Sequence, residues 1–236
     1  MKKIILTSVL FVAVAAIMFS SCKKKEENTT PVVTLLGNIS DTVSLNSASY
    51  VDSGATAYDA EDGILYVTDD ITPTNPNLDS AGTYIITYSA KDGNDETGRV
   101  KRTVVVRNDA YYLAGNYTTT EGAATWDQAV TTSATKNNVL VFEKFSNLSG
   151  NNAIQGLLFT SVGNQYIKLS PALQTASGVG PDACNYEFAE NNPVGTKLIK
   201  FGTKWTFSIN FTKTLTGGAG GCTPTSALPF TNAFTQ

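Results

Sequence analysis

The sequence DSAGTYIITYSA, residues 79–90, carries a clear strand signal. Tyr84, Ile86, Tyr88 and Ala90 recur at every second position, which places them on one face of a β-strand. The turn sequence DGN follows at residues 92–94. Working outward in both directions, the chain continues as short strands separated by turn signals, and this pattern predicts a β-sandwich. The other strands expected in this first part are residues 32–36, 42–45, 54–58, 64–68 and 99–107.

Several motifs of this part occur in a characteristic order. They are TLLG (34–37), YVDSGATA (50–57), DG (62–63), AGTY (81–84), TYSAKD (87–92) and TVVV (103–106). Together they resemble the bacterial Ig-like domain family first described from a pesticidal crystal protein, over residues 31–108. The resemblance implies an Ig-like sandwich that acts as a spacer or adhesion module and has no catalytic residues. Tyr84 fits a tyrosine corner, with its hydroxyl bonded back across the turn after Asp79.

Two acidic loops, residues 59–63 and 92–98, are expected to meet at one end of such a sandwich. Their carboxylates could supply oxygen ligands to Ca²⁺, although the spacing matches no defined calcium loop and solvated loop acids are the alternative. The last strand starts at this end and runs away from it, so the second domain is expected at the opposite end. The candidate calcium ligands are Asp59, Glu61, Asp62, Asp92 and Asp95.

A second domain is expected over residues 111–236, after a joint at Asn108-Asp109. Its clearest strand is 204–213, where Trp205, Phe207 and alternate residues after them are apolar, so Trp205 is expected in the core. We predict an antiparallel meander that closes as a lipocalin-like barrel or packs as a sandwich, with Pro229-Phe230 in a last edge strand. LAGNY (113–117) resembles the opening of small domains that end many Bacteroidota lipoproteins. The other expected strands are 112–119, 124–132, 138–145, 153–160, 165–169, 185–189 and 197–201.

The N-terminus indicates where the protein resides. Lys2 and Lys3 precede an apolar run over residues 4–19, and small residues then lead to Cys22. This resembles a bacterial lipoprotein signal, with residues 1–21 removed, Cys22 lipidated and residues 22–30 forming a linker from the membrane. The charged KKKEE that follows resembles tags that direct Bacteroidota-type lipoproteins to the outer face of the outer membrane. We therefore expect a lipid-anchored outer-membrane protein that faces the extracellular side.

Composition excludes several functions. The chain has no histidine, so no Ser-His-Asp triad, Cys-His pair or imidazole metal site can form. No motif pairs two acids for glycoside hydrolysis, and we expect a protein that is not an enzyme and has no cofactor beyond the Ca²⁺ considered above. Residues 31–109 hold five basic and twelve acidic residues, a net −7, and residues 110–236 hold seven and six, a net +1. Neither balance suits nucleic acid.

Cys184 and Cys222 remain as an even pair once Cys22 is lipidated, and in an exported protein they are expected to form a disulfide. Two free buried thiols are the alternative.

Exposed aromatic side chains flanked by amides and carboxylates are typical of carbohydrate sites. We expect a non-enzymatic binding or display protein, with polysaccharide as the leading ligand and an outer-membrane transporter complex as partner. One alternative is an adhesion or envelope-structural protein. Another is a lipocalin-like carrier of a small apolar ligand. The candidate ligand-binding residues are Trp126, Asp127, Gln128, Tyr166 and Tyr186.

Overall fold

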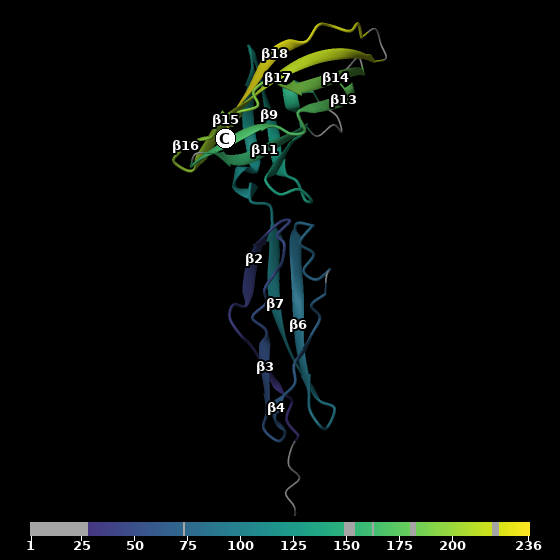
Figure 1. Ribbon diagram of the computed structural model, residues 1–236, viewed down its shortest axis with the longest axis vertical. Coiled ribbons are helices and arrows are strands. Elements are labelled where there is room, and N and C mark those ends of the chain that lie inside the picture. The colour runs from purple at the N-terminus through teal and green to yellow at the C-terminus, as the bar shows by residue number, and fades with distance from the viewer. Residues whose placement is uncertain (1–27, 73, 149–153, 162, 180–182, 219–221) are drawn as a thin grey trace, which may run out of the picture.

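The computed structural model describes residues 28–236 apart from 73, 149–153, 162, 180–182 and 219–221. The signal segment, Cys22 and the linker up to residue 27 lie outside the described residues, so lipidation stays a prediction. None of the helices in the described ranges is long and apolar enough to cross a membrane. The chain is all-β, as predicted, and forms two parts stacked along the long axis of the molecule (Figure 1).

The N-terminal part is a sandwich of two sheets. One sheet has the order β1-β3-β4 and the other β2-β7-β6-β5, with β2 and β7 parallel and the other neighbours antiparallel. The prediction of a single strand over residues 64–68 is wrong. These residues are divided between β4 and β5, because the chain crosses from one sheet to the other at Tyr66-Val67. The bounds are β1 Val32–Leu35, β2 Ser40–Ser44, β3 Ala55–Asp59, β4 Gly63–Leu65, β5 Thr68–Asp69, β6 Gly82–Lys91 and β7 Thr97–Arg107.

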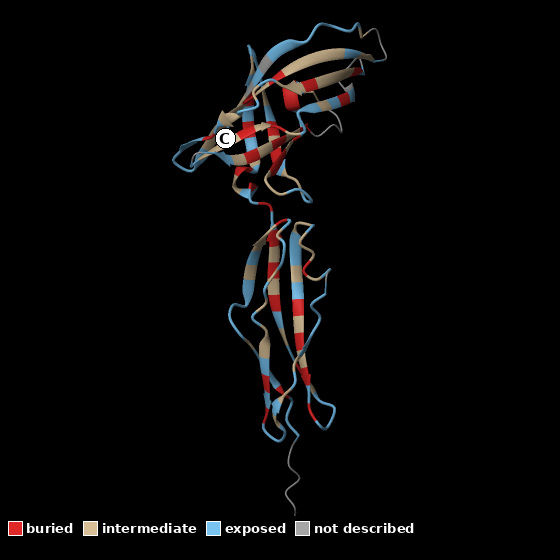
Figure 2. Ribbon diagram, in the orientation of Figure 1, coloured by how far each residue is buried: buried red, intermediate tan, exposed pale blue. Residues whose placement is uncertain are grey.

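The predicted alternation along β6 is confirmed. Ile86, Tyr88 and Ala90 are buried, and buried residues also alternate along β7 (Figure 2). The Tyr84 hydroxyl donates to the Ser80 carbonyl at 2.8 Å, which confirms the predicted tyrosine corner. These contacts fix β6 against the turn that precedes it.

A charged residue completes the core of this sandwich. Arg102, on β7, is fully buried and forms an ion pair with Asp52, whose second oxygen accepts from the Tyr88 hydroxyl at 2.5 Å. The guanidinium also donates to the carbonyls of Asn38 (2.9 Å) and Gly54 (3.2 Å). A buried charge is tolerated only when it is paired and its donors are satisfied, and Arg102 meets both conditions.

Tyr50 extends this network toward the surface. Its hydroxyl donates to Asp41 at 2.7 Å and lies 3.2 Å from Asp52. Burial, together with the bond to Asp41, raises the pKa of Tyr50 to about 12. Burial, with the nearby Tyr50 next in effect, raises the pKa of Tyr88 to about 12. The YVDSGATA motif therefore supplies two members of this network, Tyr50 and Asp52.

The joint between the two parts is built around Asn108. This residue is buried, and its amide nitrogen donates to the carbonyls of Ser133 and Lys136, both at 2.9 Å. Its side-chain oxygen accepts from the backbone N–H groups of Ala110 and Asn138, both at 3.0 Å. Both polar ends of this side chain are thus satisfied, which fixes the path of the chain between the two parts.

The loop over residues 133–138 also reaches back to the N-terminal part. Ala81 N–H donates to the Ala134 carbonyl at 2.7 Å, and Asn137 N–H donates to the Asn46 side chain at 2.9 Å. Arg107 lies over the Tyr111 ring, 3.6 Å from its centroid. The joint is therefore a hydrogen-bonded contact between the two parts and not a bare linker.

The C-terminal part is one large antiparallel sheet of order β13-β14-β17-β18-β8-β9-β10-β11-β12-β15, with β16 on β17. The sheet curls, and residues 196–201 connect its two sides. Within this segment β15 pairs with β12, and β16 pairs with β17 on the other side of the curl. The bounds are β8 Gly115–Glu121, β9 Ala124–Thr132, β10 Val139–Phe142, β11 Ile154–Ser161, β12 Asn164–Leu169, β13 Leu173–Val179, β14 Cys184–Glu190, β15 Thr196–Lys197, β16 Ile199–Phe201, β17 Lys204–Gly218 and β18 Leu228–Thr235. Two short 3₁₀ helices are η1 Tyr111–Leu113 and η2 Phe145–Asn147.

This order departs from a simple meander. The C-terminal strand β18 lies between β17 and β8, so the prediction that Pro229-Phe230 belongs to an edge strand is wrong. Strand β13 was not predicted, and the start of the strand expected over 112–119 is η1. Strand order depends on pairings between residues more than a hundred positions apart, which local alternation does not specify.

Aromatic rings fill the interior of the curled sheet. Phe207 lies 4.7 Å from Phe234 and 5.4 Å from Tyr117 between ring centroids, and Phe145 lies 4.8 Å from Phe211. Trp205, expected in the core, is only partly buried and packs at the edge of this cluster. The rings occupy the space where a lipocalin-like carrier would hold its ligand.

The predicted disulfide between Cys184 and Cys222 is present, with its Cα atoms 5.7 Å apart. It joins the first residue of β14 to the segment that leads into β18. The bond therefore fixes the approach of the C-terminal strand to the middle of the sheet.

Candidate functional site

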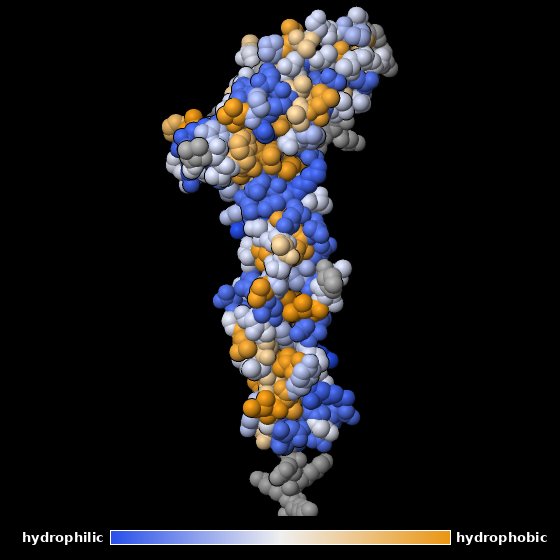
Figure 3. All heavy atoms as spheres, viewed as in Figure 1, coloured by the Kyte–Doolittle hydropathy of each residue, from blue (hydrophilic) through white to orange (hydrophobic). Residues whose placement is uncertain are grey.

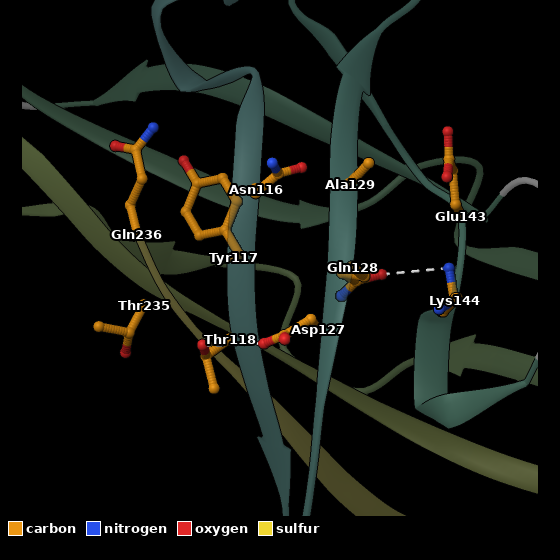
Figure 4. Close-up of a pocket in the computed structure, with 10 residues that line it drawn as sticks. All are labelled: Asn116, Tyr117, Thr118, Asp127, Gln128, Ala129, Glu143, Lys144, Thr235 and Gln236. Carbon is orange, nitrogen blue, oxygen red and sulfur yellow. Dashed lines mark hydrogen bonds between the residues drawn. The ribbon is translucent and has the colours of Figure 1, made fainter.

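An open groove of about 500 Å³ lies on the outer face of the C-terminal part, across β18, β8 and β9 and beside the end of β10. Figure 4 shows the side chains that line it, which come from neighbouring strands, and the hydrogen bond between Gln128 and Lys144. The lining residues are Asn116, Tyr117, Thr118, Asp127, Gln128, Ala129, Glu143, Lys144, Thr235 and Gln236.

Strand alternation selects which of these side chains a ligand can reach. Asn116 and Thr118 on β8 are exposed, whereas Tyr117 between them is buried in the core. Asp127 on β9 is exposed beside them and accepts from the Thr118 hydroxyl at 3.1 Å. The groove thus presents amide, hydroxyl and carboxylate groups, which suit the hydroxyls of a sugar, together with the charged Glu143 and Lys144.

The three consecutive candidates on β9 do not form one site. Adjacent strand residues point to opposite faces, so Asp127 faces the groove while Trp126 and Gln128 face inward. Gln128 is buried, donates to the Thr119 hydroxyl at 2.9 Å and accepts from Lys144 N–H at 3.2 Å. Its amide therefore supports the wall of the groove from beneath. This corrects the expectation that Trp126, Asp127 and Gln128 bind a ligand together.

Trp126 is partly buried, and its indole N–H donates to the Lys144 carbonyl at 2.9 Å. It therefore holds the segment after β10 that carries Lys144 to the groove. This position makes the indole a reporter of changes at the groove and not a flat platform for a sugar ring.

The other aromatic candidates lie elsewhere. Tyr186, on β14, is partly buried and packs against the ring cluster, with its ring 6.5 Å from Phe188. Tyr166, on β12, pairs across the sheet with Phe159 and stacks on its ring at 5.7 Å on the outer face. The structure therefore does not bring Trp126, Tyr166 and Tyr186 into one site.

The acidic loops of the N-terminal part do meet, as predicted. Gly93 N–H donates to Asp62 at 2.6 Å, which ties the two loops together. The carboxylates mostly serve the loops themselves: Asp59 accepts from the N–H groups of Glu61 and Asp62 at 2.9 and 3.0 Å. Bonds from backbone N–H groups lower the pKa of Asp59.

The remaining candidate ligands are also engaged. Asp92 accepts from Asn94 and Glu96 N–H groups at 2.9 and 2.8 Å, and its other oxygen is buried without a hydrogen-bond partner. Asp95 pairs with Lys91 at 2.6 Å. Within the described residues, no three acidic or cysteine side chains gather closely enough to hold a metal ion.

One polar cluster was missed by sequence reasoning. Lys213 Nζ lies 2.9 Å from Glu121 and 2.6 Å from the Ser146 hydroxyl, which donates to Glu121 at 2.7 Å. A serine beside a lysine can be a nucleophile and its base. Here the carboxylate pairs with the ammonium, and an ammonium has no lone pair to take the serine proton. The cluster instead joins β8, η2 and β17.

Residues 33–106 match the family model described as "Bacterial surface protein, Ig-like domain". The match confirms the resemblance inferred for residues 31–108, and the N-terminal sandwich is called the Ig-like domain below. No curated protein matches the chain.

Solved structures show only loose likeness. The chain is similar to the lipoprotein BT2262 from Bacteroides thetaiotaomicron, with 14% identity over 87% of this chain and 100% of the other, at a TM-score of 0.29. It is also similar to a Clostridium perfringens ZmpB structure with CBM51-2 in complex with GlcNAc, with 13% identity over 87% of this chain and 43% of the other, at a TM-score of 0.24. These superpositions are too loose to assign a fold or a function.

Proposed function

We propose that the protein is a lipid-anchored lipoprotein on the outer face of the outer membrane, which uses its Ig-like domain as a stalk and its C-terminal part as a non-enzymatic polysaccharide-binding module. The supporting observation is where the chain enters and leaves the stalk. Residues 28–30 meet the acidic loops, where Thr29 donates to Glu61 at 2.7 Å and Asn94 donates to Asn28 at 2.7 Å. The chain leaves at the opposite end through β7 (Figure 1).

This geometry holds the C-terminal part away from the anchor. Strand β7 has 11 residues and spans roughly 35 Å at the rise of an extended strand. The hydrogen-bonded joint at Asn108 then fixes the orientation in which the C-terminal part is presented. A rigid spacer between a lipid anchor and a module suits capture of a polymer outside the cell, and an outer-membrane transporter complex is the proposed recipient.

The groove is the proposed polysaccharide site because its exposed polar residues, Asn116, Asp127 and Thr235, come from the three strands β8, β9 and β18. These side chains offer amide, carboxylate and hydroxyl groups to sugar hydroxyls, and the strands that carry them are fixed by the sheet. The ring-filled interior argues against the small-ligand carrier.

Tryptophan fluorescence of the mature chain without its lipid, titrated with pooled plant and host polysaccharides, tests this proposal. Both tryptophans lie in the C-terminal part, and Trp126 contacts the groove wall through Lys144. We expect a saturable change for at least one neutral glycan that is lost in an Asn116→Ala/Asp127→Asn variant. Glu187→Gln, on β14, is the matched control and should bind as the wild type does. A flat response from folded protein would contradict polysaccharide capture.

The lipid anchor needs a separate experiment. Metabolic labelling with a radioactive fatty acid should mark the wild-type protein and fail to mark a Cys22→Ala variant. Protease added to intact cells should degrade the wild type. Labelling of the variant would contradict lipidation at Cys22, and protection from protease would contradict the outward orientation.

Adhesion is the second candidate because one face of the Ig-like domain is apolar and exposed. Val32, Tyr58 and Ile64 lie side by side across β1, β3 and β4, and Ile64 is 88% exposed. Figure 3 shows hydrophobic atoms over this region of the N-terminal part. Envelope proteins that co-purify with the wild type and are lost with Ile64→Asn, in the absence of glycan binding, would favour this function.

A further inference from the structure

A second outer surface of the C-terminal part has a composition unlike the groove. Residues 191–213, which include β15, β16 and the first part of β17, contain four lysines and no acidic residue. Residues 154–170, which include β11 and β12, also contain no acidic residue. The hairpin formed by β16 and β17 projects from the left side of the C-terminal part in Figure 1. Figure 3 shows hydrophobic atoms near the tip of this hairpin.

Aromatic and basic side chains share one face here. Tyr166 pairs directly with Lys197 across β12 and β15, and Tyr166 stacks on Phe159. Phe201 pairs with Lys204 across the β16–β17 hairpin. Leu198 is buried, so strand alternation places Lys197 and Phe201 on the outer face, together with Tyr166 and Lys204. We name this set, Phe159, Tyr166, Lys197, Phe201 and Lys204, the basic aromatic face.

The outer half of this face is open. Phe201 is 68% exposed, and Lys197 and Lys204 are exposed and form no ion pair among the described residues. Phe159 is partly covered, by the backbone at Gly195 and by Lys168, whose ammonium lies 5.4 Å from the ring centroid. Lys197 and Phe201 are four residues apart, which corresponds to roughly 13 Å along an extended backbone.

We propose that the basic aromatic face binds an acidic polysaccharide. Its carboxylate or sulfate groups pair with Lys197 and Lys204, and the flat faces of its sugar rings stack on Tyr166 and Phe201. This surface is separate from the groove. It extends the proposed function to charged glycans and rests on the proposed surface location of the protein.

Other polyanions fit the observations less well. The chain carries a net charge of −3 and the C-terminal part only +1, so a densely charged nucleic acid is disfavoured. An anionic lipid surface is disfavoured because the face lies on the part far from the anchored end of the stalk (Figure 1). Lysines separated by aromatic and hydroxyl side chains, including Thr206, instead suit a polymer with widely spaced charges and many hydroxyls.

Isothermal titration of the mature chain without its lipid against polygalacturonate, alginate, hyaluronan and dextran sulfate tests the proposal. Fully methyl-esterified pectin is the matched probe for polygalacturonate, because it keeps the backbone and removes the charge. We expect at least one acidic polymer to bind, and esterified pectin to bind at least tenfold more weakly than polygalacturonate if the latter is that ligand. Binding should weaken as salt rises.

Variants locate the site. Lys197→Gln/Lys204→Gln should lower affinity about tenfold, as expected for losing charge-assisted contacts, and Phe201→Ala should lower it several-fold. Lys136→Gln, an exposed lysine on the loop at the joint, is the matched control and should bind as the wild type does. The groove variant Asn116→Ala/Asp127→Asn should also retain the acidic ligand, so failure of the groove proposal and failure of this one are distinguishable.

Several results would overturn the proposal. They are no binding to any of the acidic polymers, equal binding of the charged and esterified pectins, and an equal loss in Lys136→Gln. Equally tight binding of polyglutamate, single-stranded DNA or phosphatidylglycerol vesicles would also overturn it, because the ligand class would then be wrong.

Discussion

The two parts of the chain fill their cores with different kinds of side chain. The Ig-like domain buries a small apolar cluster of Ile86, Tyr88 and Val104 and completes it with the buried Arg102 and its partners. The C-terminal part packs a much larger apolar cluster, in which the rings of Phe207 and Phe234 stack and Phe142 packs against both at a tilt.

The difference in core composition follows from the space that each fold encloses. A narrow sandwich of short strands leaves little room between its sheets, and one guanidinium that bonds several carbonyls at once can tie them together. A wide curled sheet leaves a volume that only bulky side chains fill, because voids in a core are costly. The first part should therefore depend on individual polar contacts and the second on packing and on its disulfide.

Loss of Arg102 should have the largest effect. An Arg102→Met substitution leaves Asp52 buried without its cation, and we expect the free energy of unfolding of the Ig-like domain to fall by about 3–5 kcal/mol. Hydrogen exchange measured peptide by peptide would follow the two parts separately, and the C-terminal part should be unchanged. Arg99→Met, at an exposed position on the same strand, is the control. A loss below about 1 kcal/mol would show that the polar network is not what holds this core.

Removal of the disulfide should destabilise the C-terminal part and leave the Ig-like domain unchanged. A Cys184→Ser/Cys222→Ser variant frees a loop of 38 residues, and the chain-entropy model gives a loss of about 3–4 kcal/mol. Denaturation followed by tryptophan fluorescence reports the C-terminal part alone, because Trp126 and Trp205 both lie there. Reduction of the wild-type protein should reproduce the effect. An unchanged midpoint would mean that the sheet holds β18 without the bond.

Alkaline pH should produce a smaller effect on the Ig-like domain. The pKa values of Tyr50 and Tyr88 are raised to about 12 in the folded state, so folding favours the protonated phenols. Their stabilisation is complete below the unfolded pKa of about 10 and is lost as pH rises through 12. Hydrogen exchange of β6 and β7 across this range, corrected for the intrinsic rate, should show the loss.

A Tyr50→Phe variant tests which groups cause this pH dependence. The variant removes one of the two phenols, so the Ig-like domain should lose less stability between pH 10 and 12 than the wild type does. At neutral pH it should lose about 1 kcal/mol with the bond to Asp41. An identical alkaline profile in the variant would assign the loss to other groups.

The site could be predicted only in part. Asp127, expected among the ligand-binding residues as a carboxylate beside Trp126, does lie in the groove. Its neighbours Asn116 and Gln236 were not predicted. Asn116 is placed beside Asp127 by the local pairing of β8 with β9. Gln236 reaches the groove only because β18 inserts between β17 and β8, a pairing that no local pattern encodes. The basic aromatic face likewise depends on residues 196–201 bridging β12 and β17.

The sequence by itself determined the all-β class, the Ig-like motifs, the alternation of β6 and the Cys184–Cys222 pair, since each follows from period, spacing or composition. Only the tertiary structure decided that Arg102 is buried, that Trp126 and Gln128 face inward, and where β18 enters the sheet. The reason is physical. Side-chain alternation is a local property of a strand, whereas burial of a charge and the order of strands depend on partners far away in the chain.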